Sequence, residues 1–556
     1  MAARFARLAQ WLALEAAAEQ AALAAAEQRG ENHLSRLVLQ DEQVGLGERL
    51  VWRLRLRQPQ AELPWTPLSA GSPVIVTEEG TAPVRSWRGV VSRLQRTAIE
   101  IAFAHAPEPE GERPCFAVDL APDAVARQRM EQALARVAAA RGCRLADLRD
   151  VLIGRLPARF SAAAVDADLL AGLNAVQQAA VRQAMAAEDV ALIHGPPGTG
   201  KTTTLVAVIR AAVRRGERVL ACAPSNMAVD NLCLGLLAAG EPIVRLGHPA
   251  RLAPQLQAHA LDALVAQHDD VRLAQQMRRE ALDLQRQAGK WRRAQPERGA
   301  KQTQRREARE LFDTARQLEA QAVARILDGA PILLATLTGL DGAQLGERTF
   351  DLGVIDEAGQ ATEPATWIPV PRVRRVVLAG DPQQLPPTVL AREAAGLGVS
   401  LLEGLMAGET AVSTRLEVQY RMHADIMGFS SAEFYDGSLR AAESVAGHLL
   451  ADLPGVARRA ETETAVVFID TAGASYEEEV EPDGSSRLNR QEAALVVRQV
   501  RLLRAAGVQD IGIITPYAAQ VRLLRAQLPD DVEIHSVDGF QGREKEAIVI
   551  SLVRSN

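Results

Sequence analysis

The sequence is poor in cysteine, and the surroundings of its four cysteines exclude two classes of protein. Cys115, Cys143, Cys222 and Cys233 form no C-x2-C pair and have no histidine cluster beside them. A disulfide framework and a structural zinc domain are therefore not expected. Because unpaired cysteines of this kind suit a reducing compartment, we predict a cytoplasmic protein.

Long apolar runs are missing as well. No stretch of 18 consecutive apolar residues occurs, so no membrane-spanning segment is expected. Residues 1–14 loosely imitate a signal peptide, but Glu15, Glu19 and Glu27 continue the same helical pattern without a small-residue cleavage site. We therefore predict an amphipathic helix of the mature protein. The formal net charge of −6 argues against a globally basic surface, although it leaves room for a local basic groove.

The length of 556 residues is too great for one hydrophobic core, and we expect two to four domains. After an N-terminal helix within residues 1–40, apolar and polar residues alternate around 50–57 as in a strand. Further short strands are predicted at 73–77, 87–94 and 98–103. Strands this short and closely spaced are typical of a small β-barrel, which we assign to residues 41–122, with a β-rich spacer as the alternative. Residues 123–160 are predicted to form a helical linker.

From about residue 161, predicted strands and helices alternate, which is typical of an α/β fold with a parallel sheet covered by helices. We assign residues 161–410 to a first α/β domain and residues 411–556 to a second, smaller one. The predicted strands are 190–194, 218–223, 332–336, 352–356 and 375–379 in the first domain, and 465–469, 511–514, 532–535 and 547–552 in the second. Residues 262–328 interrupt the first domain with a polar stretch, predicted to be a projecting helical hairpin. Its charge between Val271 and Arg309 is basic, which fits either a solvated face or contact with a polyanion.

One short stretch matches the phosphate-binding loop pattern G-x4-G-K-[ST]. It consists of Gly195, Pro196, Pro197, Gly198, Thr199, Gly200, Lys201 and Thr202, and Thr203 follows it directly. The apolar run 190–194 enters it as a buried strand would, and residues 202–214 leave it with helical periodicity. In such a loop Lys201 reaches the β- and γ-phosphates and the Thr202 hydroxyl binds Mg²⁺. A glycine-rich turn without a ligand is the alternative, but the context predicts that the chain binds a nucleoside triphosphate.

Three further motifs supply the groups that hydrolysis of a triphosphate needs. Residues 354–359 end an apolar strand in Asp356, predicted to lie in the Mg²⁺ shell, and Glu357, predicted to position or activate the attacking water. Within 378–387, the amide of Gln384 can sense the γ-phosphate. At 416–423, Arg421 can stabilise charge on the transferring phosphoryl group. Each motif standing alone would be a strand end, a turn or a surface arginine.

Together these stretches resemble superfamily 1 helicases, and most closely the 5′-to-3′ branch that contains the nonsense-mediated-decay helicase and the immunoglobulin-mu-binding-protein type. The resemblance also rests on residues 173–177, 223–231, 245–251, 335–336, 513–517 and 536–546. It implies two RecA-like phosphate-loop motor domains, with the barrel and the hairpin as accessory parts. It implies an ATP- and Mg²⁺-dependent enzyme that moves along single-stranded RNA or DNA and unwinds duplexes in the 5′-to-3′ direction. We expect the chain to act as a monomer.

The resemblance also assigns residues to the two ligands. Gln177 and Tyr420 would flank the adenine, and Glu544, beside Gly542, would hold the ribose. The residues near the single strand would be Pro224, Ser225, Asn226, Thr336, Thr515, Pro516 and Ser536. Short polar side chains suit contacts to phosphate and sugar, which position a strand without reading its sequence. The aromatic content of 4% agrees with such backbone tracking more than with many stacked bases.

The chain departs from the family pattern after residue 546. The family's last motif, which brings a second arginine to the γ-phosphate, is not found, so the second motor domain is expected to be incomplete. Two functions remain open: an ATP-driven motor, and an ATP-responsive clamp on nucleic acid with little turnover. An unrelated phosphate-loop switch or transporter ATPase is disfavoured by the motifs at 378–387, 416–423 and 536–546. The choice between RNA and DNA is also open, because it rests on contacts to the 2′-hydroxyl.

Overall fold

The computed structural model describes residues 1–28, 33–44, 50–58, 61–64, 66, 68–103, 107–110, 114–289, 300–408, 412–481, 486–529 and 531–554. The chain divides into two units. The first contains Met1–Ile193, Thr202–Pro382 and Pro386–Thr414, and the second contains His194–Lys201, Gln383–Leu385 and Arg415–Asn556. Among the described helices, none combines the length and the apolar character that crossing a membrane would need.

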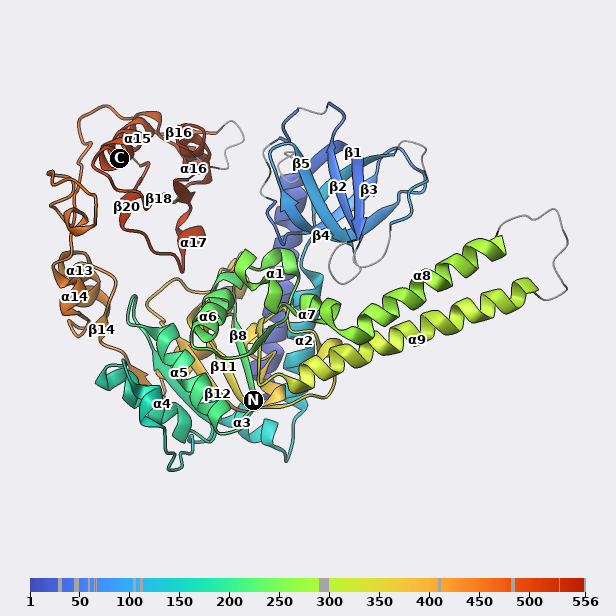
Figure 1. The fold of residues 1–556 in the computed structure, drawn as a ribbon. Coiled ribbons are helices and arrows are strands. Elements are labelled where there is room, and N and C mark those ends of the chain that lie inside the picture. Colours follow the sequence, from blue (N-terminus) through green and yellow to red (C-terminus); the bar gives the residue numbers. More distant parts are fainter. Residues whose placement is uncertain are drawn as a thin grey trace. The chain divides into compact units, whose positions relative to one another are not determined.

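The first unit begins with a long helix and a closed β-barrel (Figure 1). The helix is α1 (Ala2–Gln28), and the barrel runs in the order β1 (His33–Val44), β2 (Leu50–Leu56), β5 (Ala98–Phe103), β4 (Ser86–Leu94), β3 (Pro73–Glu78) and β6 (Cys115–Leu120). The barrel confirms the sequence-based prediction. Strands β1 and β6 were not predicted, and β1 runs across the boundary placed at residues 40 and 41.

Aromatic rings fill the barrel because alternate residues of each strand point inward. Trp52 on β2 is fully buried, with its ring centroid 5.1 Å from that of Phe103 and 5.0 Å from that of Phe116. The polar residues between the inward ones, such as Arg53, lie on the outer face, where Arg53 faces Glu100 on β5. The alternation that predicted the strands therefore also separates the core from the surface.

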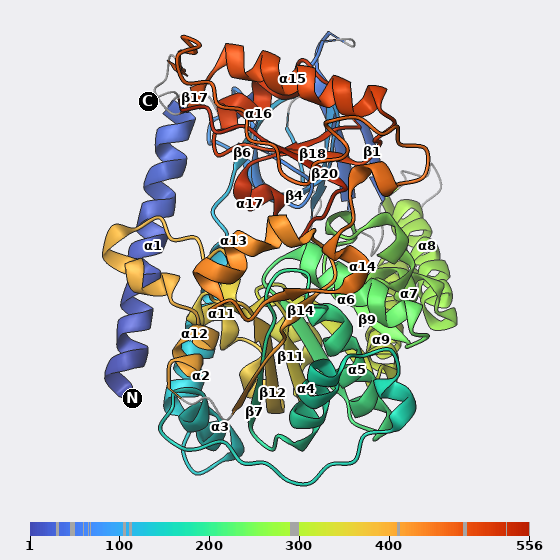
Figure 2. The ribbon, with the colours of Figure 1, turned by 90° about the vertical axis from the view of Figure 1, so that its left-hand side faces the viewer.

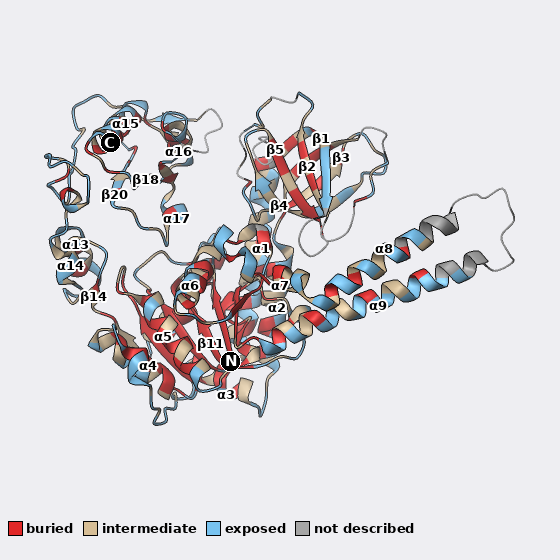
Figure 3. Cartoon of the chain, in the orientation of Figure 1, coloured by how far each residue is buried: buried red, intermediate tan, exposed pale blue. Residues whose placement is uncertain are grey.

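A seven-stranded sheet forms the centre of the first unit, in the order β13-β7-β12-β11-β8-β10-β9. Its strands are β7 (Val190–His194), β8 (Val219–Ala223), β9 (Ile243–Arg245), β10 (Ile332–Thr336), β11 (Phe350–Ile355), β12 (Val373–Gly380) and β13 (Ser413–Arg415). Strands β9, β10, β8, β11 and β12 pair in parallel, and nearly all their residues are buried (Figure 3). Parallel sheets are normally covered on both faces. The predicted α/β class is confirmed.

Helices flank this sheet, and their starts carry local signals. Asn174 and Gln177 form a capping box at the start of α4, each side chain binding the other residue's backbone N–H at 2.9 Å. Besides α1 and the two helices of the hairpin described below, the helices of the first unit are α2 (Ala124–Ala139), α3 (Arg144–Leu152), α4 (Ala175–Ala186), α5 (Lys201–Arg214), α6 (Asn226–Ala238), α7 (Leu261–Gln267), α10 (Gly342–Leu345), α11 (Glu363–Thr366) and α12 (Leu401–Met406). Short 3₁₀ turns include η5 (Ala358–Gln360) and η7 (Arg392–Gly398).

The predicted hairpin is an antiparallel pair formed by α8 (Asp269–Gly289) and α9 (Ala300–Gly329) (Figure 1). Its seam consists of fully buried alanines at intervals of seven residues: Ala274 and Ala281 on α8, and Ala308, Ala315 and Ala322 on α9. A seven-residue repeat keeps one face of each helix on the partner, and the small side chain lets the two backbones approach closely. The predicted break at 296–299, with Trp291, lies outside the described residues.

The second unit contains a smaller parallel sheet, in the order β19-β18-β20. Its strands are β18 (Ile511–Ile514), β19 (Glu533–His535) and β20 (Ala547–Ile550), with short pairs β14 (Val418–Gln419) and β15 (Arg440–Ala441), and β16 (Glu479–Val480) and β17 (Arg487–Leu488). Its helices are α13 (Ala424–Phe434), α14 (Glu443–Ala446), α15 (Arg490–Ala505), α16 (Ala518–Arg525) and α17 (Val537–Phe540).

The strand predicted at residues 465–469 is wrong. These residues have no regular structure, and Val467 and Phe468 are 60% and 81% exposed. Five consecutive apolar residues are typical of a buried strand, but a strand also needs a neighbour for its backbone hydrogen bonds. Within the part of the chain that the structure describes, no strand pairs with this segment.

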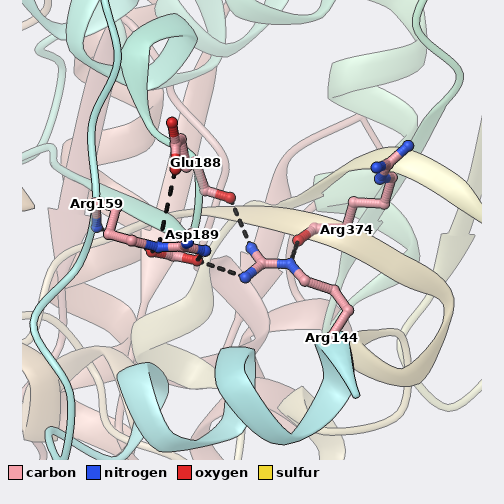
Figure 4. A network of polar contacts seen from close by, with 5 residues as sticks. All are labelled: Arg144, Arg159, Glu188, Asp189 and Arg374. Carbon is pink, nitrogen blue, oxygen red and sulfur yellow. Dashed lines mark hydrogen bonds and ion pairs between the residues drawn. The ribbon is translucent and has the colours of Figure 1, made fainter. Parts of the chain in front are cut away.

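A buried carboxylate ties three segments of the first unit together (Figure 4). The side chain of Asp189, just before β7, is fully buried and accepts hydrogen bonds from the Arg159 backbone N–H at 2.9 Å and from its guanidinium at 2.9 and 3.0 Å. Arg144 on α3 also donates to Asp189, and to the carbonyl oxygens of Glu188 and Arg374. Burial opposes ionisation of Asp189, but the bonds from Arg159 and Arg144 outweigh it and lower its pKa to about 2.

Replacing Asp189 by asparagine is expected to lower the free energy of unfolding by about 2 kcal/mol near neutral pH. The pKa of Asp189 is depressed on folding, so its stabilising contribution is complete above about pH 4 and is lost as the pH falls through about 2. Urea denaturation of wild type and Asp189→Asn at several pH values measures this difference. A difference that stays constant between pH 4 and 2 would contradict the assigned role of the carboxylate.

Candidate nucleotide-binding site

The phosphate loop lies between β7 and α5, as predicted, and its backbone requires glycine at several positions. Gly198 and Gly200 have φ values of +73° and +75°, a region that side chains rarely adopt. A Cβ atom on Gly195 would lie 2.9 Å from Cβ of Lys201, which is itself 9% exposed. Thr199 donates its hydroxyl hydrogen to the Pro196 carbonyl at 2.7 Å and closes the turn. The loop is thus a built concave turn at a helix N-terminus, where backbone N–H groups suit an anion.

Replacing Gly198 by alanine is expected to weaken ATP binding about 5- to 30-fold. The left-handed conformation costs a residue with a Cβ about 1–2 kcal/mol, and the added atom would lie 2.8 Å from Cβ of Arg421, so the loop has to change shape. Gly216 provides the matched control, because it has a φ of +78° with nothing within 4 Å of an added Cβ. Titration with a fluorescent ATP analogue should show weakened binding for Gly198→Ala and unchanged binding for Gly216→Ala. Equal affinities for both variants would argue against the loop geometry.

The two carboxylates after β11 have different surroundings. Asp356 is 2% exposed, and its Oδ1 accepts the Glu357 N–H at 2.8 Å. Glu357 is partly exposed and has a φ of +51°, a left-handed conformation that is uncommon for a residue with a side chain. Gln360 donates to Glu357 Oε2 at 2.9 Å and orients the carboxylate. A strained backbone of this kind is often found at functional sites, where the surrounding structure maintains it.

The segments after β11 and β12 touch through glycine. A Cβ atom on Gly359 would lie 2.8 Å from the carbonyl oxygen of Asp381, and one on Gly380 would lie 2.8 Å from the Gly359 nitrogen. The backbone after Asp356 therefore packs directly on the backbone that leads toward Gln384. Gln384 itself is partly buried and belongs to the second unit.

Sequence reasoning assigned no role to Gln419, which organises the turn that carries Tyr420 and Arg421. This side chain is fully buried. Its Oε1 accepts the N–H groups of Arg421 and Met422 at 2.8 and 2.7 Å, and its Nε2 donates to the Met422 carbonyl at 2.7 Å. The Tyr420 N–H in turn donates to the Gly198 carbonyl at 2.8 Å. The turn thus lies against the phosphate loop within the second unit. The sequence did contain a signal for this role, because Gln419 lies in the middle of the motif at 416–423.

Two predicted ATP contacts meet each other in the second unit. Arg421 Nε donates to Glu544 Oε2 at 2.6 Å, although the motif at 416–423 predicts that Arg421 contacts the transferring phosphoryl group and the resemblance assigns Glu544 to the ribose. The two side chains are 41% and 68% exposed. An ion pair this exposed contributes at most about 1 kcal/mol, so a polyphosphate can compete for the arginine. Of the other predicted nucleotide contacts, Tyr420 is 44% exposed, while Gln177 is buried in its capping box.

In the first unit, the residues predicted to contact the nucleic acid lie at the ends of two adjacent β-strands, β8 and β10. Thr336 at the end of β10 is paired with Ala223 at the end of β8, directly before Pro224. Ser225 caps α6 by accepting the Ala228 N–H at 3.2 Å. Asn226 Oδ1 accepts a hydrogen bond from the fully buried Arg245 at 3.0 Å. The structure therefore brings 224–226 and Thr336 together at the edge of the sheet from which Asp356 also emerges.

In the second unit, the residues predicted to contact the nucleic acid directly follow the β-strands β18 and β19. Thr515 N–H donates to the His535 carbonyl at 3.2 Å, which places Thr515 beside Ser536. The Thr515 side chain is fully buried, and its Oγ1 has no hydrogen-bond partner among the residues that the structure describes, whereas Pro516 is exposed. Ser536 Oγ accepts the Gly539 N–H at 3.3 Å. The three residues cluster, but the hydroxyl of Thr515 does not reach the surface of this unit.

Two family models match successive parts of the chain from residue 172 onward. A family model described as an AAA domain matches residues 172–392, and a second one with the same description matches 397–556. The chain is 40% identical over 542 residues to the DNA-binding protein SMUBP-2 of Rattus norvegicus, covering 94% of this chain and 54% of that protein. It is 40% identical over 402 residues to the DNA polymerase alpha-associated DNA helicase A of Schizosaccharomyces pombe, covering 69% of this chain and 59% of that protein.

A third relative is the regulator of nonsense transcripts 1 homolog of Neurospora crassa, 36% identical over 406 residues, with 69% of this chain and 34% of that protein covered. The chain spans about half the length of the SMUBP-2 proteins it matches. Among solved structures, the crystal structure of Arterivirus nonstructural protein 10 (helicase) covers 92% of this chain and 72% of its own, at 13% identity. Its TM-score of 0.36 is too low to carry an argument about this chain.

Proposed function

We propose that this chain, which belongs to the superfamily 1 helicases in the branch of SMUBP-2 and the regulator of nonsense transcripts 1, hydrolyses ATP to move along single-stranded RNA or DNA. The observation that carries the proposal is the built phosphate loop, with its left-handed Gly198 and Gly200, against which the turn carrying Arg421 lies. Relatives whose names include DNA helicase and DNA-binding protein support a nucleic-acid substrate. Movement in the 5′-to-3′ direction is part of the proposal.

The residues present fit a magnesium nucleotide. Mg²⁺ is usually bound by one or two protein oxygens together with substrate phosphates and water. Asp356 and Thr202 provide such oxygens, and no cluster of three or more His, Cys, Asp or Glu in the described ranges suggests a metal cage. When bound, Mg²⁺ would neutralise charge on the phosphates. The loop amides and Lys201 would bind the phosphates, Glu357 would orient water, and Arg421 would stabilise the developing negative charge.

The nucleic acid is proposed to contact residues at the ends of β-strands in both units. These are 224–226 and Thr336 in the first unit, and 515–516 and Ser536 in the second. Contacts of short polar groups and backbone amides to phosphate and sugar hold a strand without selecting its sequence. We therefore expect stimulation by single strands of unrelated sequence. The proposed ATP site also includes contacts to the adenine and the ribose. Gln177 and Tyr420 would contact the adenine, and Glu544 with Gly542 would contact the ribose.

Mg²⁺-dependent ATP hydrolysis, measured with and without single-stranded RNA and DNA, tests the proposal. A chain carrying Lys201→Ala serves as the blank. Hydrolysis that rises with a single strand and is lost in the blank would support the motor. A rate equal to the blank, with ATP still bound and the affinity for single strands dependent on ATP, would instead favour the clamp. Hydrolysis that no single strand stimulates would contradict both.

A further inference from the structure

Helix α1 is attached to two segments of the first unit. One segment follows β11 and the other follows β12. The helix lies against α2 and η7 in the first unit (Figure 2). Phe5, Leu8, Leu12 and Ala16 form one buried stripe along it. The Phe5 ring centroid lies 5.6 Å from that of Trp367. This spacing of three and four residues defines one helix face, so α1 packs that face against the core of the first unit.

The first attachment is an ion pair near the start of α1. Arg4 donates from Nε and Nη2 to the two carboxylate oxygens of Glu363, at 2.9 and 2.7 Å. The Glu363 side chain is 8% exposed and also accepts the Trp367 indole N–H at 3.1 Å. Glu363 follows Asp356 by seven residues. A two-pronged bond between arginine and a carboxylate fixes orientation as well as distance.

The second attachment lies in the middle of α1. Glu15 Oε1 accepts the N–H of Leu390 at 2.8 Å, and Oε2 accepts the N–H of Ala391 at 2.9 Å. These are the last two residues before η7, whose N-cap, Ala391, has no side-chain cap of its own. Glu15 therefore caps η7 from another helix, and its negative charge suits a helix N-terminus. Ala391 follows Gln384 by seven residues.

A close contact one turn before Glu15 holds the same segment. The ring of Trp11 occupies the space beside Gly396, where an added Cβ would clash with the indole. The segment that leaves β12 is thus fixed at its start, where Gly359 packs on Asp381, and at its end by Glu15 and Trp11. Gln384 lies between these two anchors, followed by two prolines that restrict the backbone.

We infer that Glu15 is a positioning residue for ATP hydrolysis, because its carboxylate fixes the far end of the segment that carries Gln384. The inference rests on the proposed function. Releasing Leu390 and Ala391 gives the segment more conformations, so Gln384 spends less time at the geometry that hydrolysis needs. The phosphate loop and Lys201 are not part of this segment, so binding of ATP should change little.

The test compares Glu15→Gln with wild type. Glutamine keeps one acceptor oxygen but turns an NH₂ group toward a backbone N–H, so one of the two bonds is lost. We expect the strand-stimulated kcat to fall about 5- to 20-fold, with less than a twofold change in KM for ATP, since misplacement of a catalytic group by ~1 Å can cost up to ~10²-fold. Amide exchange at Ala391 should become faster. Glu15→Asp, which keeps both oxygens on a shorter side chain, should recover part of the rate.

Glu19 gives the matched control, because it lies one turn further along α1 and its side chain forms no hydrogen bond or ion pair with the described residues. Glu19→Gln should behave as wild type. Unchanged kcat in Glu15→Gln, or unchanged exchange at Ala391, overturns the inference alone. A fall in kcat that matches a loss of bound ATP also overturns it, because the variant would then have lost its fold or its site. A wild-type chain without hydrolysis overturns the proposed function and the inference together.

Discussion

Arg421→Ala is expected to slow ATP hydrolysis by about 10³–10⁵-fold while ATP still binds, because an arginine that contacts the transferring phosphoryl group acts mainly in the transition state. The structure supports this choice of arginine. The turn that carries Arg421 is fixed by the buried Gln419 and bonded to the Gly198 carbonyl through Tyr420. Its guanidinium forms an exposed ion pair with Glu544.

Steady-state hydrolysis measures the effect of Arg421→Ala on the rate, and titration with a fluorescent ATP analogue measures its effect on ATP binding. Arg440→Ala is the control, because Arg440 follows in the same segment but forms an exposed pair with Glu417 at 3.1 Å. It should hydrolyse ATP at the wild-type rate. Arg421→Lys should recover only part of the loss, since lysine keeps the charge without the planar group that binds two oxygens at once. A wild-type rate in Arg421→Ala would remove this residue from the proposed site.

The phosphate loop could be predicted from sequence because its signal is local. The left-handed angles of Gly198 and Gly200 are conformations that glycine adopts readily, and the apolar run before the loop is β7. The strands of the first sheet were predictable for a similar reason, because a parallel strand buried on both faces is a continuous apolar run. The roles assigned to Lys201, Thr202 and Asp356 stay predictions.

The features that sequence reasoning missed join residues that are far apart in the chain. Glu15 meets Leu390 and Ala391 across more than half of the chain, and Arg4 meets Glu363. Nothing in a helical pattern states which loop a surface carboxylate will cap. The buried Asp189 was missed similarly, because its two arginines lie 45 and 30 residues earlier in the sequence. Apolar pattern alone also failed at 465–469, where pairing decides whether a strand forms.

Lys201→Ala is expected to lower ATP hydrolysis by about 10²–10³-fold, the effect of removing one preorganised charged donor from phosphates in a water-poor site. Lys201 is the first residue of α5 and is 9% exposed. Its chain packs on Gly195, since a Cβ there would lie 3.1 Å from Cδ and 3.2 Å from Cγ of the lysine. The ammonium group is therefore carried on a supported stem, which limits the entropy lost when it contacts phosphate.

The comparison between Lys201→Ala and Arg421→Ala distinguishes their roles. In the proposed site Lys201 would contact the β- and γ-phosphates both before and during hydrolysis, so its loss should weaken ATP binding as well as lower kcat. Arg421→Ala should reduce kcat alone. Arg214, near the other end of α5, pairs with Asp168 at 2.7 Å on the surface, and Arg214→Ala should leave both quantities unchanged. If Lys201→Ala bound and hydrolysed ATP as the Arg214 control does, Lys201 would take no part in binding the triphosphate, and its assignment to the β- and γ-phosphates would be wrong.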